Sequence, residues 1–163
     1  MKQDALHATK FLEKYLNMNN IDYMMEALKE AKKAYEEKEV PVGAIVVLNG
    51  SIIGRGHNSR IADNRISAHA EIKAIEDAEK TLGYVNLEGA SIYVTLEPCP
   101  MCSYAIMESH IEKLYFGATD PKRGAISNLD IFNKKLGSKV EVYGNILDEE
   151  SSELLKTFFK NKR

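Results

Sequence analysis

Cysteine is scarce in this chain of 163 residues, which contains only Cys99 and Cys102. Two cysteines are too few for a disulfide-stapled scaffold, and they fit a reducing compartment. Long apolar runs are missing as well, since none approaches the roughly 20 residues that a membrane-spanning helix needs. Met1–Asp4 lead into no apolar segment like that of a signal peptide. We therefore expect a cytoplasmic protein that does not enter a membrane.

An excess of positive charge is also missing, because 22 Lys and Arg residues face 24 Asp and Glu residues, for a formal net charge of −2. Indiscriminate nucleic-acid binding needs a broad basic surface, so this balance argues against it. Basic clusters at 122–123, 134–135 and 156–163 are, taken one by one, typical of solvated surface. The chain has no repeats or linkers, and its length fits one domain with a sizeable core.

Hydrophobic periodicity predicts helices and strands that alternate along the chain. Asp22 and Ser67 are expected to cap helices, and Asn49-Gly50 is a strong signal for a two-residue hairpin turn. Strands interleaved with helices favour a central mixed sheet that is covered on both faces. The predicted elements are helices over 4–16, 22–37, 67–82, 101–109 and from 148 onward, and strands over 42–48, 51–56, 90–96, 111–117 and 139–143.

The motif His69-Ala70-Glu71, followed by Pro98-Cys99-Pro100-Met101-Cys102, indicates metal chemistry. One histidine and two cysteines suit Zn²⁺, and three protein ligands leave the fourth tetrahedral position open, as in catalytic zinc sites. Zinc lowers the pKa of water toward about 7, and Glu71 supplies a proton acceptor beside it. The same pattern is the signature of zinc-dependent nucleobase deaminases, in which hydroxide attacks the carbon that carries the amine.

Two other interpretations of the motif have to be weighed. A redox-active Cys-x-x-Cys pair would leave His69 and Glu71 without a role. A closed structural zinc site would need a fourth ligand, and none of His7, His57 and His110 stands at a ligand-like spacing. Both halves of the motif also fall at predicted helix N-termini, where the helix dipole and free N–H groups lower thiol pKa values and favour metal binding. The catalytic zinc site is therefore the favoured interpretation.

Longer stretches extend the pattern along the chain: Glu39-Val-Pro-Val-Gly-Ala-Ile-Val-Val47, Gly56-His-Asn58, Ala68-His-Ala-Glu71, Tyr93-Val-Thr-Leu-Glu-Pro-Cys-Pro-Met-Cys102, Tyr115-Phe-Gly-Ala118 and Leu154-Leu-Lys-Thr-Phe-Phe159. Together they resemble the bacterial tRNA-specific adenosine deaminases, whereas the zinc motif alone indicates only the cytidine-deaminase-like superfamily. The resemblance covers about residues 23–163. We assign 21–163 to a zinc-dependent deaminase domain and 1–20 to a helical N-terminal extension.

The resemblance implies an α/β/α sandwich around a mixed five-stranded sheet, usually as a homodimer. It implies hydrolytic deamination of the wobble adenosine of a tRNA anticodon loop to inosine. His69, Cys99 and Cys102 would then bind one Zn²⁺ per chain, and Glu71 would move protons. Asn58 would hydrogen-bond the flipped base, and Phe159 would lie near the RNA. From the residues alone, Asn58 also suits a turn and Phe159 also suits a core.

Two other functions stay open at this point. A deaminase of a free base or nucleoside, of the guanine or cytosine type, is favoured by the acidic net charge and by Arg65-Ile66-Ser67, where the resembled family usually has Asp-Pro-Thr. Thr95-Leu96-Glu97, which precedes the Pro-Cys pair, favours the tRNA group instead. The third possibility is an inactive, zinc-stabilised RNA-binding scaffold, but such a protein has no need of Glu71.

Overall fold

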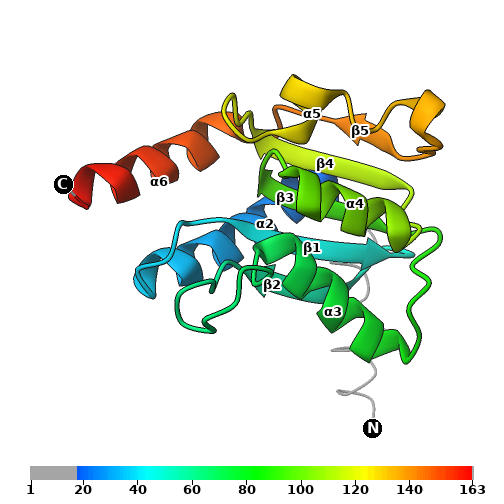
Figure 1. Cartoon of the computed structure of the whole chain (residues 1–163). Helices are drawn as coiled ribbons and strands as arrows, with labels where there is room; N and C mark the ends of the chain where they lie inside the picture. The colour runs from blue at the N-terminus through cyan, green and yellow to red at the C-terminus, as the bar shows by residue number, and fades with distance from the viewer. Residues whose placement is uncertain (1–17, 163) are drawn as a thin grey trace, which may run out of the picture.

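The computed structural model describes residues 18–162, so the helix predicted over 4–16 lies outside the described part of the chain. Helices and strands alternate along it, close to the predicted order (Figure 1). The elements are α2 (Asn20–Glu36), β1 (Gly43–Leu48), β2 (Ser51–His57), α3 (Ala70–Leu82), β3 (Ser91–Leu96), α4 (Pro100–Glu108), β4 (Lys113–Ala118), α5 (Ala125–Leu129), a 3₁₀ turn (Lys134–Leu136), β5 (Glu141–Tyr143) and α6 (Asp148–Asn161).

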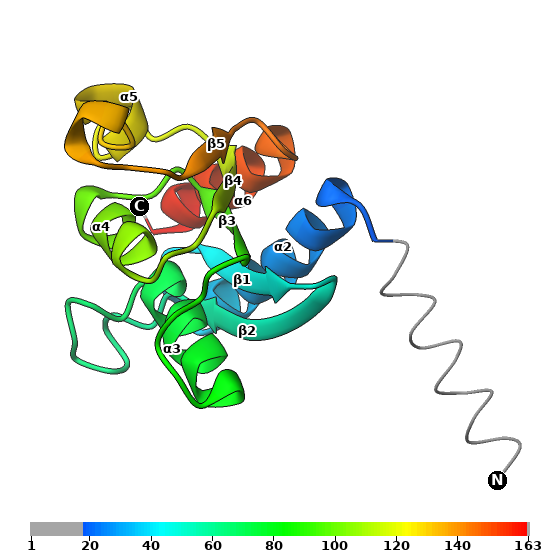
Figure 2. The same cartoon turned by 90° about the vertical axis from the view of Figure 1, so that its right-hand side faces the viewer.

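The five strands form one mixed sheet in the order β2-β1-β3-β4-β5. β1 runs antiparallel to β2 and β3, whereas β3, β4 and β5 are parallel. Helices α3 and α4 cover one face, and α2 and α6 pack on the other; Figure 2 shows α2 and α4 on opposite sides of the sheet. This is the three-layer α/β/α sandwich of the cytidine-deaminase-like fold, so the predicted fold class is confirmed.

Successive residues of the central strands point to opposite faces, which explains why these strands are apolar throughout. Ile45 pairs with Tyr93, and Tyr93 with Tyr115, and all three belong to the core under α2. The neighbouring Val46 pairs with Ile92 and belongs to the core under α3 and α4. Both faces of the sheet are therefore buried.

The hairpin turn between β1 and β2 forms at Asn49-Gly50, as predicted. Both residues have positive φ angles, 50° and 77°, which is the type I′ geometry that matches strand twist. Farther along β2, a Cβ atom on Gly54 or Gly56 would collide with the backbone of α3. These two glycines let α3 lie directly on the strand, and this close approach fixes where its N-terminus meets the sheet.

Both predicted helix caps were wrong, and each error has a local cause. Asn19 caps α2, while Asp22 is the third helical residue and completes a capping box by accepting from the Asn19 N–H. Ser67 instead forms a tight turn in which its carbonyl accepts from His69 N. Helix α3 consequently begins at Ala70, with His69 as its N-cap. No helix within residues 18–162 is long and apolar enough to cross a membrane.

Candidate active site

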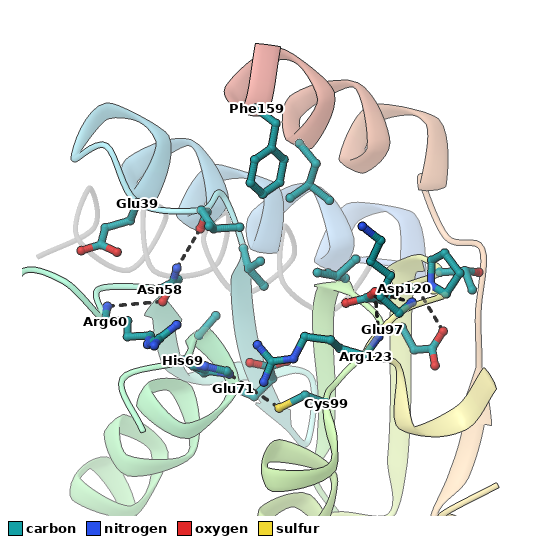
Figure 3. Close-up of a pocket in the computed structure, with 18 of the residues that line it drawn as sticks. Glu39, Asn58, Arg60, His69, Glu71, Glu97, Cys99, Asp120, Arg123 and Phe159 are labelled. Atoms are coloured by element: carbon teal, nitrogen blue, oxygen red, sulfur yellow. Dashed lines mark hydrogen bonds between the residues drawn. The ribbon is translucent and has the colours of Figure 1, made fainter. Parts of the chain in front are cut away.

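A cavity of about 750 Å³ opens at the carboxyl ends of β3 and β4, where α3 and α4 begin (Figure 3). This volume lies within the range of small-molecule sites. The far wall comes from α6. Its lining includes five of the six predicted site residues, and the sixth, Cys102, is fully buried beside them. The residues that line the cavity include Glu39, Val40, Asn58, Arg60, His69, Glu71, Glu97, Cys99, Asp120, Lys122, Arg123, Phe159 and Lys162.

His69, Cys99 and Cys102 converge at the floor of this cavity. His69 Nδ1 lies 3.7 Å from Cys99 Sγ and 3.5 Å from Cys102 Sγ, and the three donor atoms lie within 4.8 Å of one another. Tetrahedral zinc with its usual bond lengths holds nitrogen and sulfur ligands about 3.6 Å apart. The spacing and the donor types therefore fit a metal ion, and zinc in particular.

Two residues of this group are helix N-caps, and mutual hydrogen bonds dominate their electrostatics. His69 caps α3 and Cys99 caps α4, and neither uses its side chain to cap a backbone N–H. Hydrogen bonds from Cys102 and His69 lower the pKa of Cys99 to about 4. The same contact with Cys99, together with burial, raises the pKa of Cys102. A bound cation would favour the deprotonated form of both thiols.

The hydrogen bond with Cys99 is also the main reason that the pKa of His69 is raised. The positive charge of Arg123 opposes this rise in the pKa of His69. Figure 3 shows Arg123 directed toward the cavity floor, near His69 and Glu71. An arginine therefore stands over the metal-ligand end of the cavity.

Glu71 lies in the first turn of α3, two residues from His69, and its side chain is buried with 4% exposure. Burial raises its pKa, and the group that can hold a metal does not include it. A carboxyl group with a raised pKa, placed beside a metal site but not bound to the metal, can take up and return a proton near neutral pH.

Asn58 lies at one side of the cavity, and Phe159 lies on α6, at the end away from His69 and Glu71 (Figure 3). Asn58 is buried after β2, where its Nδ2 donates to Val40 O at 3.1 Å and its Oδ1 accepts from Arg60 N at 3.3 Å. Phe159 is 50% exposed, whereas Phe158 is 6% exposed. The core position suggested as an alternative for Phe159 therefore belongs to Phe158.

Two buried acidic residues of the site, Glu39 and Glu97, were missed as functional candidates. Glu39 is 2% exposed, and its Oε1 accepts from Ile61 N and Ala62 N at 2.9 and 2.8 Å. It thereby holds the loop that follows Asn58. Glu97 holds a second loop in a similar manner. For Glu97 the available signal was an acidic residue directly after an apolar strand, which has to be satisfied by hydrogen bonds once it is buried.

The fold and this site define a deaminase of the MafB19-like family, whose sequence model matches residues 18–163. More particularly, the chain belongs to the family of tRNA-specific adenosine deaminases. It is 49% identical to the tRNA-specific adenosine deaminase of Bacillus subtilis over 86% of this chain and 89% of that protein. A solved structure from work on A-to-I editing by tRNA:A34 deaminases at the wobble position is 44% identical, with a TM-score of 0.79 over 82% of this chain and 98% of that one.

A guanine deaminase from Bacillus subtilis is more distant. Its solved structure is 34% identical, with a TM-score of 0.60, and the match covers 63% of this chain and 66% of that one.

Proposed function

We propose that the protein is a zinc-dependent hydrolytic deaminase that converts the wobble adenosine of a tRNA anticodon loop to inosine and releases ammonia. The observation that carries this proposal is the His69, Cys99 and Cys102 group beside buried Glu71, at the floor of a cavity that could admit a nucleotide. The identity to a tRNA-specific adenosine deaminase along most of both chains supports the choice of substrate.

Each residue of the floor has a defined task in this reaction. His69, Cys99 and Cys102 would hold the zinc ion, which when bound supplies water activated for attack at neutral pH. Glu71 takes the proton of the attacking water and delivers it to the ring nitrogen beside the amine-bearing carbon. It then moves the proton of the newly added hydroxyl group to the amine, the carbon–nitrogen bond breaks, and adenosine and water have given inosine and ammonia. The burial that raises the pKa of Glu71 suits a group that holds this proton in transit.

The walls would bind the flipped base. Asn58 Oδ1 accepts a single bond, from Arg60 N at 3.3 Å, so it retains a lone pair for a donor on the base. The half-exposed ring of Phe159 offers a face on which a neighbouring base can stack. Flipping is least costly in a single-stranded loop such as an anticodon loop, because no base pair has to be broken.

Four cations around the cavity support an RNA substrate despite the acidic net charge. Arg60, Lys122, Arg123 and Lys162 all line the cavity. None of the ion pairs within residues 18–162 involves them. The nearby carboxyl groups of Glu39 and Glu97 accept from backbone N–H groups instead. The four positive charges are thus left available for phosphates.

A homodimer in the cytoplasm is part of the proposal. Met101 and Tyr104 on α4 are 38% and 54% exposed, and a second copy of the chain would cover such apolar surface. The cytoplasm is where a tRNA substrate is found. We also keep the division between an extension, residues 1–20, and a deaminase domain, residues 21–163, supported by a family match that starts at residue 18. Light scattering of the full chain measures the oligomeric state.

A deaminase of a free base such as guanine or cytosine is the second candidate, since the guanine deaminase shares the fold at 34% identity. The two candidates are separated by offering the zinc-loaded full chain an anticodon stem-loop with adenosine at the wobble position and, separately, free guanine, cytosine and adenosine. Inosine in the stem-loop, read by mass spectrometry of the digested RNA, supports the tRNA function. Ammonia release from a free base alone would overturn it. A Glu71→Ala variant is the matched control for contaminating deaminases.

A further inference from the structure

Glu97 is a buried carboxylic acid, 2% exposed, at the carboxyl end of β3. All four of its side-chain hydrogen bonds come from a segment 23 to 30 residues farther along the chain. Its Oε1 accepts from Asp120 N at 3.2 Å and from Ser127 Oγ at 2.5 Å. Its Oε2 accepts from Ile126 N at 3.1 Å and from Ser127 N at 2.8 Å. One side chain therefore anchors both the loop after β4 and the start of α5.

The anchored loop, residues 119–124, is called the rim loop here because five of its six residues line the cavity. A Cβ atom on Gly124 would collide with the Glu97 carboxyl group, so the loop backbone lies directly against it. Ala125 N also donates to Pro98 O at 2.9 Å. The rim loop is thus fixed to the two residues that precede Cys99.

Arg123 is the rim-loop residue whose long side chain extends into the cavity, so its position depends on how the loop is held. It is exposed, its guanidinium points toward the cavity floor (Figure 3), and it forms no ion pair within residues 18–162. A guanidinium offers five donors in a planar fork, which matches a phosphate. Asp120 N, which Glu97 holds, lies three residues before it.

We propose that Glu97 is a positioning residue for substrate binding: it holds the rim loop so that Arg123 pairs with a phosphate beside the nucleoside that is deaminated. This inference rests on the proposed function, because an RNA substrate supplies that phosphate. Glu97 does not touch the reacting atoms, and it acts through Arg123.

The two oxygens of Glu97 allow a selective perturbation. In Glu97→Gln the side-chain NH₂ is best placed at the Oε1 position, because the Ser127 hydroxyl there can turn to accept. The hydrogen bonds from Ile126 N and Ser127 N to the other oxygen are then retained. Only the hydrogen bond from Asp120 N is lost, because its N–H group then faces the NH₂ group of the glutamine, which is also a donor. Ser127→Ala is the matched control, since it removes one hydrogen bond from the same oxygen and leaves Asp120 N paired.

The experiment compares full-length, zinc-loaded variants in deamination of the anticodon stem-loop, after zinc content and thermal unfolding have been measured for each. We expect Glu97→Gln to raise KM about fivefold and Arg123→Ala about tenfold, with kcat within about twofold, because a charge-assisted contact to the RNA backbone is lost. The Kd of the stem-loop, measured by fluorescence anisotropy, should rise in parallel. Ser127→Ala should leave both constants within about twofold of the unsubstituted chain.

The double variant Glu97→Gln/Arg123→Ala decides whether Glu97 acts through Arg123. If it does, KM of the double variant equals that of Arg123→Ala alone, about tenfold above the unsubstituted chain. A product of the two single effects, about fiftyfold, overturns the proposal, as does a Ser127→Ala effect equal to that of Glu97→Gln. An unsubstituted chain that forms no inosine in the stem-loop refutes the proposed function itself. An active chain whose KM is insensitive to Glu97→Gln refutes this inference only.

Discussion

Replacing Phe158 and Phe159 by alanine, one at a time, should show that Phe158 contributes mainly to stability and Phe159 mainly to RNA binding. Phe158 is 6% exposed, and its ring meets the edge of Tyr35 at a centroid distance of 6.0 Å. Lys162 Nζ lies 5.1 Å above the same ring. Buried Phe-to-Ala changes cost about 3 to 5 kcal/mol, and a site at the end of the molecule belongs near the lower limit.

We therefore expect Phe158→Ala to lower the free energy of unfolding by about 3 kcal/mol, which for a protein of this size lowers Tm by roughly 6–12 °C. Phe159 is 50% exposed, so its truncation should cost only about 1 kcal/mol of stability. A base stacked on that ring contributes about 1–3 kcal/mol, so Phe159→Ala should weaken stem-loop binding roughly 5- to 150-fold.

Urea denaturation followed by circular dichroism measures the first quantity, and anisotropy with the anticodon stem-loop at 25 °C measures the second. Phe158→Ala should show the larger loss of stability, and Phe159→Ala should show the larger loss of stem-loop affinity. If Phe158→Ala weakens RNA binding more than Phe159→Ala at a temperature where both are folded, then Phe159 is not a stacking platform. Equal losses of stability would show that the two rings are not divided between core and cavity as the structure has them.

Four further variants test the floor and the tail. Glu71→Ala should keep zinc, because Glu71 lies outside the metal-binding group, and should lower kcat by about 10²- to 10⁴-fold, as expected for loss of a general acid–base; joint loss of metal and activity would reassign Glu71 as a ligand. Cys99→Ala and Cys102→Ala should each lose zinc and activity, read by atomic absorption and inosine formation, and an active metal-free variant would contradict the site. Removing residues 160–163 should weaken stem-loop binding and flatten its salt dependence, and an unchanged slope would exclude the tail from the RNA surface.

The sheet was predictable because its strands are apolar enough to be recognised locally. β1 and β3 begin within one residue of their predicted starts, since Val42 and Ala90 open runs that both faces of the sheet bury. The Asn49-Gly50 turn was predictable because few dipeptides accept two positive φ angles. The group of His69, Cys99 and Cys102 was predictable because the chain has only two cysteines, and the structure brings both to His69.

Features that depend on distant contacts were not predictable. α5 has five residues, and its first turn is held by Glu97, whose own position depends on the end of β3. Ser67 has the chemistry of a cap, but the tight turn to His69 displaces the helix start by three residues. Phe158 and Phe159 are adjacent and have the same side chain, so the sequence does not distinguish them. The packing of α6 against Tyr35 decides that Phe158 is the buried one.

The attachment of the cavity walls has a consequence for how this fold could change its substrate. The residues that could hold a metal stand in the first turns of α3 and α4 or just before them, whereas the loop after Asn58 and the rim loop are each held by one carboxylic acid, Glu39 and Glu97. Those loops can vary in length and charge while Glu39, Glu97 and the residues of the floor stay in place. Changes in these two loops can therefore alter what the cavity admits without moving the residues of its floor.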